Sequence, residues 1–157
     1  MKPTPIELDA TDRRLLALLQ ADCALTNDEL ANRAHVSPAT SLRRVRRLVQ
    51  AGVIERRIAI VNAEAAGGGV TAIVEVTLEQ QSAELLDRFE HHAAAAAEVQ
   101  QCYRVASGPD FVLIVFVPDM AAYHAFAHRV LTAQANVRNV RSFFAVKRSK
   151  FEPAVPL

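Results

Sequence analysis

The sequence predicts an α+β protein in two parts, with three helices first and a β-α-β-β-α-β arrangement after them. Three observations support this. Helix caps followed by apolar residues at helical spacing occur three times before residue 53. From residue 70 onward, short stretches alternate apolar and polar residues as strands do. Between them, residues 63–69 are rich in alanine and glycine, which is typical of a linker. We therefore expect domains at 1–62 and 70–157, joined by a linker at 63–69.

The caps predict where the three helices begin. Asp9 is a suitable N-cap for the first helix, and Thr26 opens the T-x-x-E pattern of a capping box for the second. Ser37 followed by Pro38 is typical of the start of a third helix, and Gly52 is suited to its end. On this third helix the spacing predicts a core-facing side made of Leu42, Val45, Leu48 and Val49.

Residues 53–61 are rich in β-branched side chains and predict a strand or a short hairpin wing. Two short helices joined by a turn and followed by a wing are the winged helix-turn-helix arrangement, whose second helix lies in the DNA major groove. The net charge of the chain is only +1. Residues 1–62, however, hold ten basic and seven acidic residues, whereas the remainder holds eight and ten. This asymmetry favours nucleic acid as the partner of the first part.

The outward face of the third helix is the predicted DNA-binding surface. Arginine can bridge guanine O6 and N7 or clamp a phosphate, and the small Ala39 lets the helix tip approach the groove. The candidate residues are Ser37, Pro38, Ala39, Thr40, Arg43, Arg44, Arg46 and Arg47. The alternative explanation is an arginine-rich solvated face. Arg44 could instead be structural, pairing with Asp28 or Glu29.

The second part predicts a strand at 70–78, a helix capped by Ser82, a hairpin of strands at 98–106 and 111–117, a helix opened by Asp119 and a strand at 137–147. This order is that of a ferredoxin-like domain, in which both helices cover one face of the sheet. Apolar residues nevertheless occur on both faces, among them Ile73 and the adjacent Phe143 and Phe144. We expect a second copy to cover the other face through a two-fold interface, giving a dimer at minimum.

Other classes of function have little support in the sequence. No phosphate-binding loop, nucleophile elbow or pair of catalytic carboxylates stands out, so we expect no catalytic residue and no enzyme activity. Cys23 and Cys102 lack a disulfide or zinc pattern, and His124 and His128 have no third ligand nearby in sequence, so we expect no metal and no cofactor. The lack of a signal peptide or a membrane-spanning stretch predicts a cytoplasmic protein with no membrane partner.

Three motifs point to a known family: Leu8-Asp9-x-x-Asp12-x-x-Leu15-Leu16, Ser37-Pro38-x-x-x-Leu42-x-Arg44-Val45-Arg46-Arg47-Leu48-x-x-x-Gly52-Val53-Ile54, and Val117-Pro118-Asp119-Met120. On these motifs the chain resembles the leucine-responsive regulatory protein/AsnC (Lrp/AsnC, or feast/famine) family of bacterial transcription regulators over nearly its whole length. The resemblance implies a sequence-specific regulator of double-stranded DNA that responds to a small metabolite, usually an amino acid. It also implies a homodimer assembled through the ferredoxin-like (RAM) domain, often assembling further to an octamer, with effectors bound between dimers.

In that family the effector loop is a β-hairpin turn with glycine followed by acidic, aromatic, aspartate and aromatic residues. Here it reads Ser107-Gly108-Pro109-Asp110-Phe111, one residue shorter, and Pro109 lacks a backbone donor. The effector-binding residues implied by the resemblance are Ser107, Gly108, Asp110 and Phe111. Two alternatives stay open: the siroheme decarboxylases, which resemble the same architecture, and a partner subunit that modulates other regulators without binding DNA.

Overall fold

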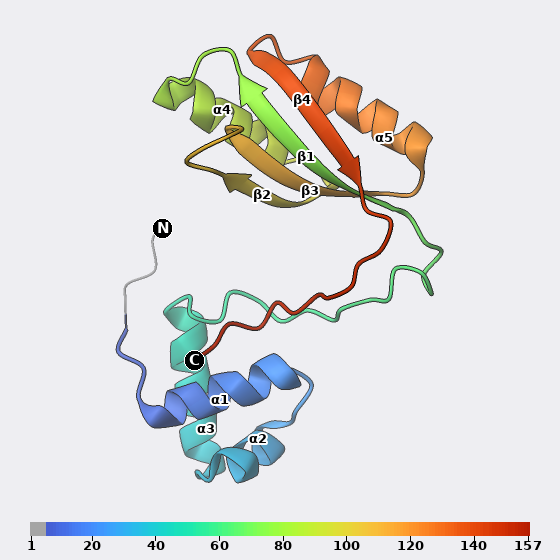
Figure 1. Ribbon diagram of the computed structural model, residues 1–157. Coiled ribbons are helices and arrows are strands. Elements are labelled where there is room, and N and C mark those ends of the chain that lie inside the picture. Colours follow the sequence, from blue (N-terminus) through green and yellow to red (C-terminus); the bar gives the residue numbers. More distant parts are fainter. Residues whose placement is uncertain (1–5) are drawn as a thin grey trace. The chain divides into compact units, whose positions relative to one another are not determined.

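The computed structural model describes residues 6–157, which form two compact units (Figure 1). The first unit contains the chain as far as Ile60 together with Phe151–Leu157, and the second contains Val61–Lys150. This division differs from the predicted one at both boundaries. The stretch expected as a free linker holds a hydrogen-bonded turn, in which Asn62 Oδ1 accepts from the backbone N–H groups of Glu64 and Ala65.

Three helices make up most of the first unit: α1 (Ala10–Ala21), α2 (Asn27–Ala34) and α3 (Pro38–Gln50). Their predicted caps are confirmed, because Asp9, Thr26 and Ser37 each accept a backbone N–H from the first turn. Between α2 and α3, His35 adopts a left-handed conformation with φ of 56°, which turns the chain sharply. Beyond α3, Gly52 has φ of 71°, as expected where a helix ends.

The core of the first unit forms where the three helices meet. Leu15, Leu30, Ala34 and Val45 pack together there, with Leu48 also fully buried. The predicted inward face of α3 is partly wrong. Leu42 and Val49 are exposed, and the buried residues of α3 are Ser41, Val45 and Leu48. Positions 41, 45 and 48 are spaced four and three apart and follow one narrow stripe, whereas positions 42 and 49 lie about 100° around the helix from positions 41 and 48.

The predicted wing strand is not formed in the described part of the chain. Residues 53–62 contain no strand, although their composition favours one. Val53 and Ile54 both donate their N–H groups to Leu48 O, which holds the segment against the end of α3. Composition alone predicted the wing wrongly because a strand is stable only when it pairs with another.

The second unit is a four-stranded antiparallel sheet with helices on one face, which confirms the β-α-β-β-α-β prediction (Figure 1). The strand order is β2-β3-β1-β4. The strands are β1 (Val70–Leu78), β2 (Val99–Arg104), β3 (Phe111–Val117) and β4 (Val137–Phe144). The helices are α4 (Ala83–Ala94) and α5 (Met120–Phe126), and α5 continues as a π-helix, η1 (Ala127–Thr132).

The two faces of this sheet differ in burial. On the covered face, alternate residues of β1 and β3 are completely buried beneath the helices. On the other face, Ile73 and its register partner Phe143 are 40% and 44% exposed. Phe144 lies on the helix side, where its ring packs edge-on against Tyr123 at 4.9 Å between centroids. An apolar surface therefore remains open on the helix-free face. Within residues 6–157, no helix has the length and apolar character needed to span a membrane.

Candidate DNA-binding surface and effector site

The start of α3 is held in place by short polar contacts. The Ser37 hydroxyl accepts from Thr40 N at 3.2 Å and donates to the Thr40 hydroxyl at 2.9 Å. From α2, the Asn27 side-chain amide donates to Pro38 O at 3.0 Å. Ser37, Pro38 and Ala39 remain exposed and Thr40 is half-buried. The first turn of α3 is therefore fixed while its small side chains face solvent, as a helix tip entering a groove requires.

The four arginines of α3 fall into two pairs. Arg43 and Arg46 are exposed and make no ion pair with any described residue. Arg44 and Arg47 instead reach across to α1. Arg44 Nη1 lies 2.6 Å from Asp9 Oδ2 and 2.9 Å from Asp12 Oδ1, and Arg47 Nη2 contacts the other oxygen of Asp12.

This ion-pair cluster corrects one expectation. Arg44 pairs with Asp9 and Asp12, and not with Asp28 or Glu29 as suggested above. Asp12 is fully buried, whereas the side chains of Arg44 and Arg47 are 20% and 45% exposed. Arg44 is therefore mainly a structural residue. Arg47 contacts the buried carboxylate of Asp12, while almost half of its side chain remains exposed to solvent.

The charges in this cluster reinforce one another. The backbone N–H of Asp12 and the guanidinium of Arg44 lower the pKa of Asp9 from 3.8 to about 2. The carboxylates of Asp9 and Asp12 in turn raise the pKa of Arg44. Asp9 and Arg44 are therefore both charged at neutral pH. The N-terminus of α1 therefore fixes how α3 is rotated, and hence which residues α3 presents outward.

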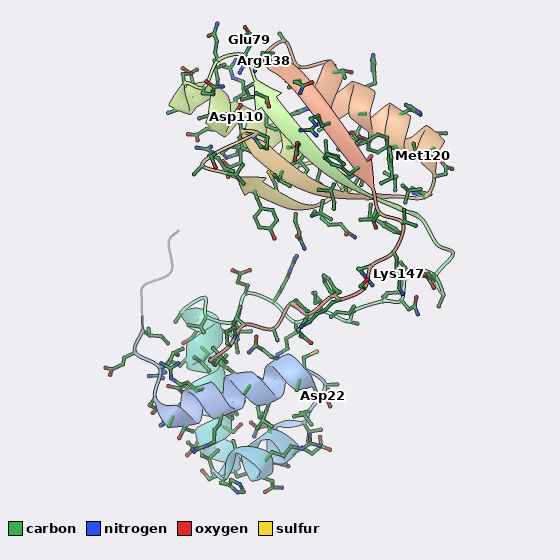
Figure 2. The ribbon with its side chains drawn as sticks, viewed as in Figure 1. Asp22, Glu79, Asp110, Met120, Arg138 and Lys147 are labelled. Atoms are coloured by element: carbon green, nitrogen blue, oxygen red, sulfur yellow. The ribbon has the colours of Figure 1, made fainter. Side chains whose placement is uncertain are left out.

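In the second unit, two hydrogen bonds of Asp110 hold the turn between β2 and β3 against β1. Asp110 N donates to Val76 O at 2.9 Å, and Asp110 Oδ2 accepts from Leu78 N at 2.7 Å. Gly108, with φ of +87°, supplies the left-handed residue that the turn needs. Figure 2 shows Asp110 and Glu79 toward the same end of the sheet.

The implied effector residues differ in what a ligand can reach. Ser107 and Gly108 are exposed, and Asp110 is half-buried with one carboxylate oxygen already bonded. Phe111 is fully buried, with its ring 4.8 Å from that of Phe89. Of the four residues, only Phe111 is closed to a ligand in this structure.

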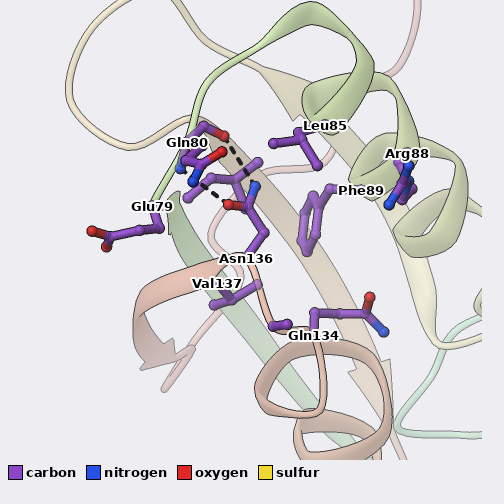
Figure 3. Close-up of a pocket in the computed structure, with 10 residues that line it drawn as sticks. Glu79, Gln80, Leu85, Arg88, Phe89, Gln134, Asn136 and Val137 are labelled. Carbon is purple, nitrogen blue, oxygen red and sulfur yellow. Dashed lines mark hydrogen bonds between the residues drawn. The ribbon is translucent and has the colours of Figure 1, made fainter.

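The second unit also contains a pocket of about 350 Å³, and none of the four implied effector residues lines it (Figure 3). It lies between the end of β1, the start of α4 and the loop before β4, and is lined by Leu78, Glu79, Gln80, Leu85, Arg88, Phe89, Gln134, Ala135, Asn136 and Val137. Asn136 closes one side, because its amide exchanges two hydrogen bonds of 3.0 Å with the backbone of Gln80. Leu78 and Phe89 connect the pocket to Asp110 and Phe111 of the turn. Sequence reasoning missed this pocket because its walls come from distant segments.

The pocket has both apolar and charged groups, as the binding of an amphipathic small molecule requires. Leu85 and Phe89 supply an apolar wall, and Arg88 supplies a positive charge at the rim, where it also pairs with Glu84 at 3.1 Å. No cluster of three or more possible metal ligands occurs in the described part of the chain.

A helix-turn-helix with an arginine-bearing second helix, together with a ferredoxin-like domain that has a pocket, defines a DNA-binding regulator with a ligand-binding domain. Comparison with known proteins agrees. Residues 8–55 match the family described as winged helix-turn-helix DNA-binding, and residues 71–155 match the Lrp/AsnC ligand binding domain. The chain belongs to the Lrp/AsnC family of transcription regulators.

Individual relatives cover nearly the whole chain. The leucine-responsive regulatory protein of Rhizobium meliloti is 37% identical over 92% of this chain and 93% of its own length. The crystal structure of an AsnC family transcriptional regulator from Agrobacterium tumefaciens is 34% identical, with a TM-score of 0.86 over 95% of this chain and 97% of that one. A transcriptional regulator from Neisseria meningitidis, solved as a complex with L-methionine, is 29% identical, with a TM-score of 0.86 over 96% of this chain and 97% of that one.

Proposed function

We propose that this regulator binds a specific DNA sequence through the tip and outer face of α3, and that an amino acid bound beside the Asp110 turn changes that binding. The observation that carries the DNA half is the division of the arginines. Arg44 and Arg47 are tied to Asp12, so Arg43 and Arg46 point away from the core beside the exposed first turn.

The two groups of residues suit different contacts with a duplex. The Ala39 N–H in the first turn of α3 and the half-exposed Arg47 would meet phosphates, which fix position without reading sequence. Arg43, Arg46 and Thr40, which are at least partly exposed, would meet base edges in the major groove. If two copies act together, their target is a roughly palindromic site with half-sites one helical turn apart or a multiple of that.

An amino acid is the proposed effector class because it combines an apolar side chain with two charged ends. The side chain would lie against Leu85 and Phe89, and the carboxylate would meet Arg88. The exposed Ser107 and Gly108, which do not line this pocket, offer backbone N–H groups as an alternative partner. Pro109 has no N–H to contribute. The L-methionine complex of the Neisseria relative supports this class.

Assembly follows from the open sheet face. A second copy covering Ile73 and Phe143 would give a homodimer, and further contacts between dimers an octamer. We also propose that the protein has no enzyme activity and acts in the cytoplasm, where its DNA target lies.

The deciding experiment is a fluorescence-anisotropy titration with the DNA upstream of the protein's own gene and with random DNA of the same length. Titrations run at two salt concentrations, with and without each standard amino acid. We expect tight binding that weakens with salt, since phosphate contacts release counterions, and a shift caused by one amino acid. Equal affinity for both DNAs would contradict the proposal and favour a partner subunit or an enzyme.

A further inference from the structure

The segment Phe151–Leu157 packs on the first unit although the chain reaches it only after the last strand of the second. One side chain holds it by its backbone. Gln20 Nε2 donates to Val155 O at 3.1 Å, and Val155 N donates to Gln20 Oε1 at 2.7 Å. A single amide from α1 thus satisfies both main-chain groups of one residue, as a neighbouring strand would.

The segment forms one wall of a groove of about 510 Å³ in the first unit, to which Pro153, Ala154, Val155 and Leu157 contribute. The facing walls come from the last turns of α1 and from the stretch between Val53 and Ile60, the same stretch that forms no wing strand. The apolar residues of these facing walls are Leu16, Leu19, Val53, Ile54, Ile58 and Ile60. The docked sequence Pro153-Ala154-Val155-Pro156-Leu157 has no charged side chain, and its two prolines restrict the free segment, which reduces the entropy lost on docking.

Docking is shallow. Val155 and Leu157 remain 61% and 44% exposed, and the two bonds to Gln20 lie at an exposed site on α1. A contact of this kind can open without unfolding either unit.

We propose that Phe151–Leu157 is a strap that docks reversibly on the DNA-binding unit and forms a second mechanical connection to the ligand-binding unit. The first connection is the chain from Ile60 to Val70. The second runs from the end of β4 at Phe144 to Val155, eleven residues that span at most about 40 Å. Two connections restrict rotation of the DNA-binding unit, whereas one would leave it free to turn.

The strap also has a direct path from the candidate effector pocket. Val137, the first residue of β4, lines that pocket, and the other end of β4 leads into the strap. A displacement of β4 by a bound effector would therefore pull on Val155. This coupling step rests on the proposed function, whereas the docking step does not.

The docking step is tested by fluorescence. The chain contains no tryptophan, so Leu157→Trp gives a single reporter inside the groove. We expect blue-shifted emission and protection from acrylamide quenching, both lost when Gln20→Ala is added. Val155→Pro removes the bonded N–H from the strap side without touching α1, and should act in the same way. Gln100→Ala, the same change at an exposed glutamine of β2, is the matched control and should leave the emission unchanged. Emission that Gln20→Ala and Val155→Pro both leave unchanged would overturn the docking.

The coupling step is tested by DNA binding of the full chain without the reporter. Gln20→Ala should lower the preference for the upstream DNA over random DNA roughly threefold to tenfold, because more loosely tethered recognition helices engage two half-sites at a lower effective concentration. It should also reduce the amino-acid-induced shift in DNA affinity, because a released strap no longer transmits a displacement of β4. An unchanged preference in a variant whose strap is released would overturn the coupling. If the parent chain itself shows no preference for the upstream DNA, both the proposed function and the coupling step are wrong. The docking step is then still decided by the tryptophan emission.

Discussion

Asp12 Oδ1 lies 2.9 Å from Arg44 Nη1 in a contact where the carboxylate is fully buried. The same carboxylate contacts Arg47 through its second oxygen. Burying charge costs solvation energy, and Arg44 Nε is itself buried without a hydrogen-bond partner among residues 6–157, so the cluster is not an efficient source of stability. Its value lies in geometry, because it fixes α3 against α1 and decides which arginines face outward.

Asp12→Asn should destabilise the first unit. The change keeps the size of the side chain but leaves Arg47 without its charge partner and weakens the hold on Arg44. We expect a loss of about 3 kcal/mol, the low end for a broken buried pair, because Arg44 keeps Asp9 and Arg47 is half-exposed. Urea unfolding followed by circular dichroism measures it. Asp28→Asn, on an exposed carboxylate, is the control and should change stability by less than about 0.5 kcal/mol. Equal losses in the two variants would contradict the role of the cluster.

Arg46→Ala should weaken binding to specific DNA by about 1–3 kcal/mol while leaving the melting temperature unchanged, since Arg46 is exposed and makes no ion pair with a described residue. Arg44→Ala should lower both, because it removes a structural contact. Anisotropy titrations at fixed salt and thermal melts separate the two effects. Full DNA affinity in Arg46→Ala would remove that residue from the interface.

The stability of the first unit should fall in acid partly through Asp9. Its pKa is lowered to about 2 from 3.8, so the ionised carboxylate stabilises the fold above the ordinary value, and this contribution disappears as the pH falls from about 4 toward 2. Asp9→Asn keeps the helix cap but loses the charge. The melting temperatures of the parent and the variant should differ at pH 5 and converge near pH 2. A gap independent of pH would show that the charge of Asp9 contributes nothing.

Asp110→Ala should uncouple the turn from the pocket. It leaves Leu78 N without its side-chain acceptor, which should cost about 1–2 kcal/mol of unfolding free energy. The amino-acid shift in DNA affinity should also be lost. Ser107→Ala, at an exposed position of the same turn, should keep the parent stability. An intact amino-acid response in a measurably destabilised Asp110→Ala would place the effector elsewhere.

Phe143→Asp should disrupt the dimer by placing a charge on the open face of the sheet opposite Ile73. Light scattering coupled to size-exclusion chromatography gives the mass directly. Val146→Asp introduces the same charge at a fully exposed position just beyond β4 and should keep the parent mass. A Phe143→Asp variant that retains the parent mass would show that this face is not the interface.

The sequence predicted the features that depend on local interactions. Caps such as Ser37 and the alternation along β1 act over a few residues, so the helices, the strands and their order could be predicted. Features that depend on contacts between distant segments were missed. Asp12 and Arg44 are 32 residues apart, Gln80 and Asn136 are 56 apart, and no spacing rule joins them. The wing was predicted wrongly for the same reason, since a strand requires a partner that composition does not specify.

The first unit is assembled from two stretches of chain separated by the whole of the second. On the ribosome, α1 to α3 therefore emerge and can pack well before Phe151–Leu157 is synthesised, so the apolar groove beside Gln20 is bare in the nascent protein. The same division matters for fragments of the protein. A ligand-binding fragment that ends at Lys150 lacks the segment Phe151–Leu157 altogether. A fragment that continues to Leu157 exposes this apolar segment without the groove that it docks in, and should tend to self-associate.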